Sequence, residues 1–183
     1  MDRAVFLDRD GTINVDKGYV YKIEDFEFIP GVLDGLRILE KQGFHLFVVT
    51  NQSGIARGYY TEEDFARLTQ YMLAVMEDSG VHVTDVLYCP HLPEAKIGKY
   101  RVNCRCRKPG TKLFHDAAEK WDIDLDRSYV IGDKLSDCAL CAECGCTGFL
   151  ISDQAGTAVL TGDIRCVDRF ASAVDEILRM GPA

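Results

Sequence analysis

Short apolar runs alternate along the chain with segments in which apolar residues recur at helical spacing. Runs of about four apolar residues bounded by polar or turn residues predict buried β-strands. We expect strands at 4–7, 46–49, 85–88, 129–131 and 148–151. This alternation predicts an α/β fold, a three-layer, doubly wound and mainly parallel sheet with helices on both faces.

Segments between and after these runs have the periodicity of amphipathic helices. One follows Pro30 and Gly31, and another begins at Thr61 with Asp64 in the pattern of a capping box and ends at Gly80. We assign the apolar faces, methionines and aromatic residues included, to the core: 32–39, 65–76, 113–121 and 170–178. Parallel strands have their carboxyl ends at one edge of the sheet, where ligands bind in such folds.

The chain has 183 residues, with 21 Lys and Arg against 29 Asp and Glu, so its formal net charge is −8. With 47% hydrophobic residues it can form a substantial core, and we expect one domain over 1–183. The acidic balance argues against nucleic acid and anionic membranes as partners. Because no run of 18 apolar residues and no signal-peptide pattern occurs, we expect a cytoplasmic protein. We also expect it to be a monomer.

Asp8 and Asp10 follow the first predicted strand and precede Gly11. Two carboxylates at a strand end can point at one ligand, and Mg²⁺ prefers such oxygen ligands. Gly11 allows the chain to turn sharply after the pair. A surface turn or a helix cap produces the same short pattern, so the pair alone leaves both interpretations open.

Three further motifs follow in order along the chain. Thr50 ends the second predicted strand, Lys108 precedes the third helical segment, and Asp133 follows Gly132 after the fourth strand. With the Asp8 to Thr12 motif, this ordered set resembles the haloacid dehalogenase (HAD) superfamily of phosphotransferases. Agreement at four spaced motifs is much rarer by chance than agreement at one.

The resemblance implies a phosphoryl-transfer site. Asp8 is the expected nucleophile, which forms an aspartyl-phosphate, and Asp10 is the expected general acid and base. Thr50 and Lys108 are expected to contact the transferring group with a hydroxyl and a positive charge. Asp137 has two open roles, to orient Lys108 or a metal-bound water, or to be a first-turn acid of a helix. The implied Mg²⁺ ligands are Asp8, a main-chain oxygen of Asp10, Asp133 and the backbone of Lys134.

A second metal site is predicted from cysteine and histidine spacing. Three thiolates and one imidazole form a set suited to tetrahedral Zn²⁺, in two short pairs with twelve residues between them: Cys89 with His91, and Cys104 with Cys106. The irregular segment 89–106 is long enough to need such an anchor. We expect a structural zinc loop that holds the adjacent Arg107 and Lys108 against the substrate. Scattered reduced thiols are the alternative.

Other cysteines and histidines are assigned to packing. One group of cysteines has a spacing that superficially suggests a further metal site: Cys138, Cys141, Cys144 and Cys146. The first members of this group, however, recur at helical spacing on the same face as small apolar neighbours, as buried thiols do. Four residues match no pattern: Cys166, His45, His82 and His115.

The runs 14–20 and 50–58, together with the zinc spacing, narrow the resemblance. They are similar to the D-glycero-D-manno-heptose 1,7-bisphosphate 7-phosphatases, a cap-less, zinc-containing family that acts in heptose synthesis for lipopolysaccharide or other surface glycans. The resemblance implies Mg²⁺-dependent removal of the 7-phosphate of a sugar bisphosphate, with either anomer open. The substrate contacts that it implies are Asp16, Tyr19, Thr50, Asn51, Gln52, Ser53, Arg107 and Lys108.

Several alternatives stay open. Arg57 is a candidate for binding the second phosphate, and an exposed loop arginine is an equally good interpretation. Histidinol-phosphate phosphatases resemble this chain, but they typically have a shorter zinc spacer and an Asp where this chain has Ser53. A non-catalytic, zinc-stabilised phosphate-binding module is also conceivable, although such a module has no use for both Asp8 and Asp10. Only about 40 residues separate Asp10 from Thr50, which leaves no room for an inserted cap domain.

Overall fold

The computed structural model describes residues 1–152 and 162–181. Its centre is a parallel sheet with the strand order β3-β2-β1-β4-β5-β6. The predicted α/β class is confirmed, and each predicted strand is present and slightly longer than predicted. The strands are β1 (Arg3–Leu7), β2 (Phe44–Asn51), β3 (Asp85–Cys89), β4 (Tyr129–Gly132), β5 (Thr147–Ile151) and β6 (Asp163–Val167).

The sequence pattern does not predict β6. This strand pairs only with β5 at the edge of the sheet, and none of its residues is fully buried. Asp163 and Arg165 alternate with Ile164 and Cys166. A half-exposed edge strand needs no continuous apolar run, so a search for such runs passes over it.

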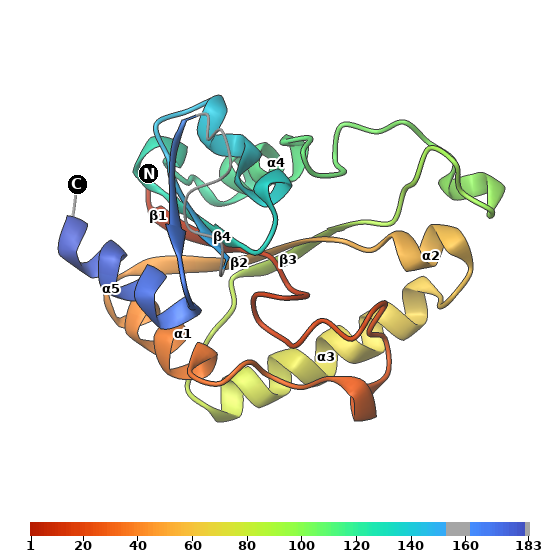
Figure 1. The fold of residues 1–183 in the computed structure, drawn as a ribbon, viewed down its shortest axis with the longest axis horizontal. Helices are drawn as coiled ribbons and strands as arrows, with labels where there is room; N and C mark the ends of the chain where they lie inside the picture. Colours follow the sequence, from red (N-terminus) through yellow and green to blue (C-terminus); the bar gives the residue numbers. More distant parts are fainter. Residues whose placement is uncertain (153–161, 182–183) are drawn as a thin grey trace.

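Helices cover both faces of the sheet (Figure 1). On one face lie α1 (Val32–Lys41), α3 (Glu62–Asp78) and α5 (Phe170–Met180), and on the other lie α4 (Lys112–Trp121) and the 3-10 helix η4 (Leu135–Ala142). The short helix α2 (Ser53–Arg57) follows β2, and three 3-10 turns complete the described helices: η1 (Ile23–Asp25), η2 (Gly98–Tyr100) and η3 (Leu125–Arg127). The capping box is confirmed, since Asp64 N donates to Thr61 Oγ1 at 3.1 Å and Thr61 N donates to Asp64 Oδ2 at 2.9 Å.

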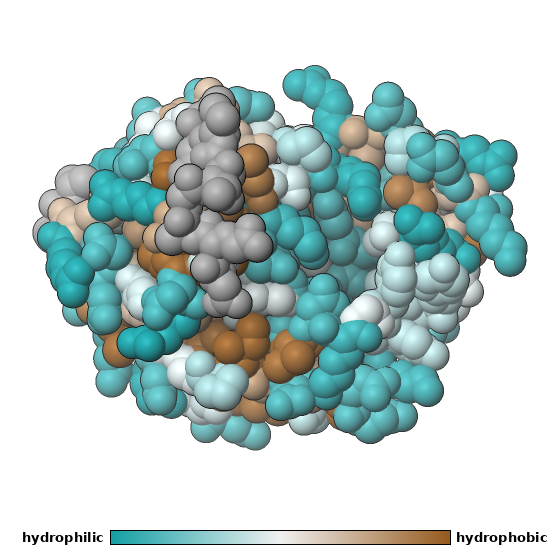
Figure 2. Space-filling model, in the orientation of Figure 1, coloured by the Kyte–Doolittle hydropathy of each residue, from teal (hydrophilic) through white to brown (hydrophobic). Residues whose placement is uncertain are grey.

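Alternate residues of the central strand β1 serve the two core layers. Val5 and Leu7 pack with the α1, α3 and α5 side, whereas Ala4 and Phe6 pack with the α4 and η4 side. A strand buried on both faces has apolar residues at successive positions, which accounts for the continuous run at 4–7. Outside these layers the face shown in Figure 2 is largely hydrophilic.

Two residues assigned to the core lie at the surface. Trp121 is 37% exposed and Leu178 is 39% exposed. Both stand at or near the carboxyl end of their helix. Trp121 instead donates its indole N–H to Asp85 Oδ2 at 3.1 Å.

The cysteine assignments hold for most of the group. Cys138, Cys141 and Cys146 are buried beside α4, as predicted, and Cys144 is half-buried. Within residues 1–152 and 162–181, these four do not form a cluster that meets metal-binding spacing. The zinc loop contains only three of the cysteines of the chain, and packing in the core explains the presence of these further ones.

Between β1 and β2, residues 8–43 contain only η1 and α1, so the predicted absence of an inserted cap is confirmed there. The loops that follow β1, β2 and β4 leave the same edge of the sheet. None of the helices in the described parts of the chain has the length and apolar character needed to cross a bilayer.

Candidate active site

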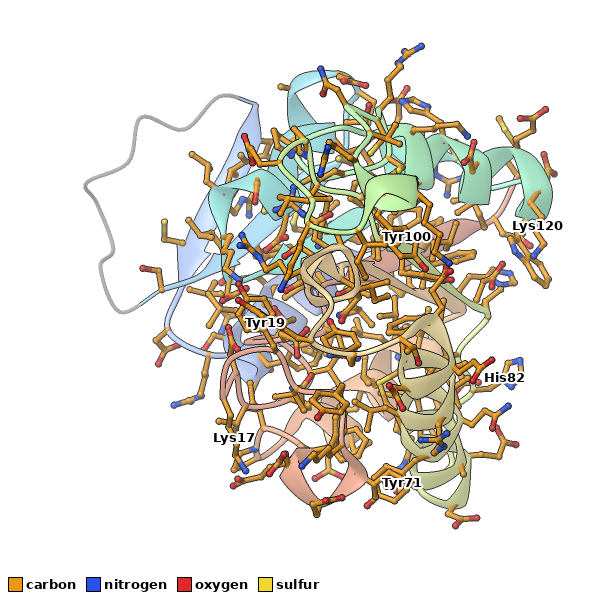
Figure 3. The ribbon with its side chains drawn as sticks, turned by 90° about the vertical axis from the view of Figure 1, so that its right-hand side faces the viewer. Lys17, Tyr19, Tyr71, His82, Tyr100 and Lys120 are labelled. Atoms are coloured by element: carbon orange, nitrogen blue, oxygen red, sulfur yellow. The ribbon has the colours of Figure 1, made fainter. Side chains whose placement is uncertain are left out.

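A pocket of about 400 Å³ brings together residues from four separate segments of the chain. In Figure 3, Tyr19 lies near the middle of the face turned toward the viewer, between Lys17 and Tyr100. Because the carboxyl ends of parallel strands meet at one edge, residues that follow β1, β2 and β4 come close together. The predicted site residues that line the pocket are Asp8, Asp10, Asp16, Tyr19, Asn51, Gln52, Ser53, Arg107, Lys108 and Lys134.

Lys108 is the central cation of this pocket. Its Nζ lies 2.7 Å from Asp8 Oδ1, 2.7 Å from Asp137 Oδ1 and 2.6 Å from the carbonyl oxygen of Val49. Burial raises the pKa of Asp8 to about 7, and Lys108 acts in the opposite direction. Burial acts to lower the pKa of Lys108, but the charges of Asp8 and Asp137 raise it above its usual value.

Asp137 fulfils both roles left open by the sequence. One carboxylate oxygen is paired with Lys108, and the other accepts the backbone N–H of Lys134 at 2.9 Å at the start of η4. A cap therefore holds the carboxylate that orients the lysine.

The described carboxylates suit a hard cation. Asp8, Asp133 and Asp137 each offer an oxygen, and these atoms lie within 4.8 Å of one another. Asp133 Oδ1 is buried without a hydrogen-bond partner, which is costly unless a cation or water satisfies it. Gly11 has φ 89°, and a Cβ there would come within 2.4 Å of Asp133 Oδ2, so the glycine keeps this space clear.

The residues at the end of β2 form hydrogen bonds with two residues of the pocket, Lys108 and Gln52. Asn51 exchanges two hydrogen bonds with the main chain of Lys108, Nδ2 to O at 3.1 Å and N to Oδ1 at 3.0 Å. Thr50 is 1% exposed, and its hydroxyl accepts from Gln52 Nε2 at 2.9 Å. The two hydrogen bonds between Asn51 and Lys108 attach the segment that contains Lys108 to the end of β2, the strand that contains Thr50.

Arg57 and Thr50 do not belong to the pocket lining described above. Arg57 is exposed, with its guanidinium carbon 5.9 Å from the ring centroid of Tyr19. Tyr19 also packs edge-on against Tyr59, with 4.8 Å between the centroids. By contrast, Arg107 lines the pocket and has a buried Nη1 without a hydrogen-bond partner, a donor that an anionic ligand would satisfy.

The predicted zinc ligands converge. The sulfur of Cys106 lies 3.1 Å from that of Cys104 and 3.3 Å from that of Cys89, and His91 Nδ1 lies 3.4 Å from Cys106 Sγ. All three thiols are free. Zn–S bonds of about 2.3 Å in a tetrahedral site place two sulfurs about 3.8 Å apart, so the donor set fits the ion, and these sulfurs lie somewhat closer together than they would around it.

Glu62 at the start of α3 ties the zinc loop to the body of the protein. It accepts the hydroxyl of Tyr88 at 2.7 Å and that of Tyr100 at 2.6 Å. Both hydrogen bonds lower the pKa of Glu62, the one from Tyr100 most and the one from Tyr88 next. The carboxylate at the start of α3 thus attaches the loop, through Tyr100, independently of any metal ion.

The chain is similar to known proteins over most of its length. Residues 105–172 match the HAD-hydrolase-like family model. The D-glycero-beta-D-manno-heptose-1,7-bisphosphate 7-phosphatase of Escherichia coli K12 is 52% identical over 134 residues, 73% of this chain and 70% of that protein. The protein of the same name from Yersinia pestis is 47% identical over 144 residues, 78% of this chain and 77% of that one. The chain belongs to this family.

The fold of this phosphatase also matches that of solved members. The D,D-heptose 1.7-bisphosphate phosphatase of B. bronchiseptica, solved in complex with magnesium and phosphate, aligns with a TM-score of 0.84 and 27% identity, over 98% of this chain and 99% of that one. The chain is accordingly a phosphoric monoester hydrolase of the HAD superfamily, and the resemblance noted in the sequence is confirmed.

Two residues of this phosphatase site escaped the sequence analysis. Arg9 is 1% exposed and donates to both oxygens of Asp10, Nε to Oδ2 at 3.2 Å and Nη2 to Oδ1 at 3.0 Å. Tyr60 is 6% exposed and donates its hydroxyl to Gln52 Oε1. In the sequence Arg9 lies between Asp8 and Asp10, and a cation in that position is a candidate ion-pair partner for a neighbouring carboxylate. Nothing in the sequence marks Tyr60.

Lys108→Met is expected to lower the free energy of unfolding by about 3 kcal/mol, because it leaves Asp8 and Asp137 buried without their cation. Urea unfolding in Mg²⁺-free buffer measures the change. Lys112→Met is the matched control, since it breaks an exposed pair with Asp116 and is expected to cost no more than about 0.5 kcal/mol. Equal losses in the two variants would contradict the assignment of Lys108 as the buried central cation.

Proposed function

We propose that this protein removes the 7-phosphate of D-glycero-β-D-manno-heptose 1,7-bisphosphate with Mg²⁺ as cofactor, as a step in heptose nucleotide-sugar and lipopolysaccharide core synthesis. The observation that carries the proposal is the buried Asp8, paired with Lys108 at 2.7 Å in a pocket that also contains Asp10. Identity of 52% to a curated phosphatase for this substrate supports the choice of sugar.

The reaction runs in two steps on this chain's own residues. The Asp8 carboxylate attacks phosphorus to form an aspartyl-phosphate, while Asp10 gives its proton to the departing sugar oxygen. Asp10 then takes a proton from water as that water attacks the same phosphorus. Inorganic phosphate leaves, and Asp8 returns as a carboxylate.

Phosphoryl transfer requires positioning and neutralisation of charge on the phosphoryl oxygens. Lys108 and Arg107 supply positive charge on the protein side of the pocket. Bound Mg²⁺ would neutralise phosphoryl charge, and its proposed ligands are Asp8, the main-chain oxygen of Asp10, Asp133 and the backbone of Lys134. The orphaned oxygen of Asp133 supports this set.

Substrate selection is proposed to depend on the rim. Asp16, Tyr19 and Ser53 line the pocket where the sugar would lie. Arg57, stacked near Tyr19, is the proposed partner of the 1-phosphate. A Zn²⁺ ion in the 89–106 loop would fix the position of Arg107 beside these rim residues. A cytoplasmic, single-domain monomer without nucleic-acid or membrane partners remains part of the proposal.

The test is release of phosphate from the two anomers of the heptose bisphosphate and from histidinol phosphate, with Mg²⁺ present. We expect kcat/KM for the β-anomer to exceed that for the α-anomer by about tenfold or more, because the anomers place the 1-phosphate on opposite faces of the ring and one fixed cation reaches only one of them. Histidinol phosphate lacks a second phosphate and is expected to be slower still.

No release from either anomer would refute the proposed activity. Faster turnover of histidinol phosphate would favour the alternative phosphatase, which gains no support from the similarities reported above. A preference for the α-anomer would leave the phosphatase in place and overturn the proposed anomer.

A further inference from the structure

Both oxygens of Asp10 are surrounded by hydrogen-bond donors. Oδ1 accepts from Arg9 Nη2 at 3.0 Å and Asn14 Nδ2 at 3.1 Å, and Oδ2 accepts from Arg9 Nε at 3.2 Å and Gln52 Nε2 at 3.1 Å. The Asp10 side chain keeps 20% of its surface exposed and lines the pocket. These four donors fix the position of the Asp10 carboxylate at the pocket.

Gln52 and Asn14 both donate to Asp10 through a side-chain amide, so their roles depend on which way the amide faces, and Gln52 is the one that Tyr60 contacts. As arranged, its NH₂ donates to Asp10 and to Thr50, and its oxygen accepts from Tyr60. In the reversed arrangement, the amide oxygen would face the Asp10 carboxylate, repel it when ionised and accept its proton when protonated. Either outcome would impair delivery of a proton to the leaving oxygen.

Tyr60 selects the productive orientation. Its hydroxyl donates to Gln52 Oε1, whereas the other donor to that atom within the described parts of the chain, Arg9 Nη2, is 3.5 Å away. The tyrosine ring is buried against Gly54, where a Cβ would come within 2.1 Å of it. Among the described residues the Tyr60 hydroxyl donates to Gln52 and makes no hydrogen bond to Asp10, Arg9 or Asn14, so we infer that it acts through Gln52.

We propose that Tyr60 is a positioning residue of the reaction: its hydroxyl holds the Gln52 amide with the NH₂ toward Asp10, and this contact fixes the Asp10 carboxylate where it exchanges a proton with the leaving oxygen and with water. This inference rests on the proposed function. It also reassigns Gln52, which the family resemblance places against the substrate, to the support of the general acid.

The test compares Tyr60→Phe with wild type on two substrates. An alkoxide leaving group needs a proton from Asp10, whereas p-nitrophenolate leaves without one. We expect kcat/KM for the heptose bisphosphate to fall about tenfold, through kcat with KM nearly unchanged, while kcat/KM for p-nitrophenyl phosphate stays within about twofold. A loss of equal size on both substrates, or no loss on the sugar, would overturn the proposal.

Tyr129→Phe is the matched control, because it also removes the hydroxyl of a buried tyrosine, here at the start of β4 and outside the pocket lining. It is expected to match wild type on both substrates. A selective tenfold loss in this variant would show that the effect does not come from the Gln52 contact.

A double-mutant cycle isolates the route through Gln52. Gln52→Met removes both ends of the amide, and Tyr60→Phe added to it is expected to change kcat/KM for the sugar by less than about twofold. A further tenfold loss would overturn action through Gln52. Failure of the proposed function would show differently, as absence of phosphate release from the wild-type protein.

Discussion

Asp8→Asn is expected to reduce phosphate release from the heptose bisphosphate by at least about 10⁴-fold, because an amide nitrogen or oxygen cannot replace the carboxylate that forms the bond to phosphorus. The side chain is nearly isosteric, so the pocket keeps its shape. Steady-state phosphate release measures the loss. Mass spectrometry of acid-quenched protein is expected to show a phosphorylated chain in wild type and none in the variant.

Asp10→Asn separates the two carboxylate roles. It leaves the nucleophile intact, so an aryl phosphate with a good leaving group is still expected to phosphorylate Asp8, and the adduct accumulates because no base activates the water. Asp116→Asn on the exposed face of α4 is the control and is expected to behave as wild type. A phosphorylated Asp8→Asn chain would contradict the assignment of Asp8 as nucleophile.

Removal of zinc is expected to lower activity by about 10²-fold at saturating Mg²⁺, the size of effect produced when catalytic groups move by about 1 Å. Cys106 directly precedes Arg107 and Lys108. Loss of the proposed Zn²⁺ ion would free the end of the loop and with it the two cations of the pocket. Phosphate release before and after chelation, with Mg²⁺ restored, gives the kinetic measurement.

Hydrogen exchange provides the structural measurement. Faster exchange is expected within 89–106 after chelation, with recovery on adding Zn²⁺. Cys104→Ser is expected to reproduce the chelated state, whereas Cys144→Ser, at a half-buried thiol outside the cluster, is expected to retain activity. An unchanged rate in zinc-free protein supplied with Mg²⁺ alone would contradict the coupling between loop and pocket.

The part of Glu62 in this coupling follows from its two tyrosine contacts. Because the carboxylate holds β3 and the 3-10 turn η2 together, the loop retains one attachment when the metal is gone. The activity loss on chelation is therefore expected to be partial and reversible, in contrast to the loss of the nucleophile.

Much of the fold was predictable from local pattern. Continuous apolar runs identify strands buried on both faces, and the Thr61 and Asp64 pair identifies a helix start, because both signals depend on residues close in the sequence. The clustering of Cys89, His91, Cys104 and Cys106 was equally predictable, since two pairs of soft ligands on an irregular loop have few other uses. Edge strand β6 and the exposure of Trp121 depend on which element lies alongside, which local pattern does not report.

The chemical types at the site follow from the sequence: two carboxylates at the end of β1, a lysine beside the zinc loop, and an acid after β4. Their connections follow only from the tertiary structure. Arg9 reaches both oxygens of Asp10, and Tyr60 meets Gln52 eight residues earlier in the chain through a turn that brings the ring back. Such contacts depend on the backbone direction and the side-chain rotamers that packing sets, and a sequence motif does not specify either.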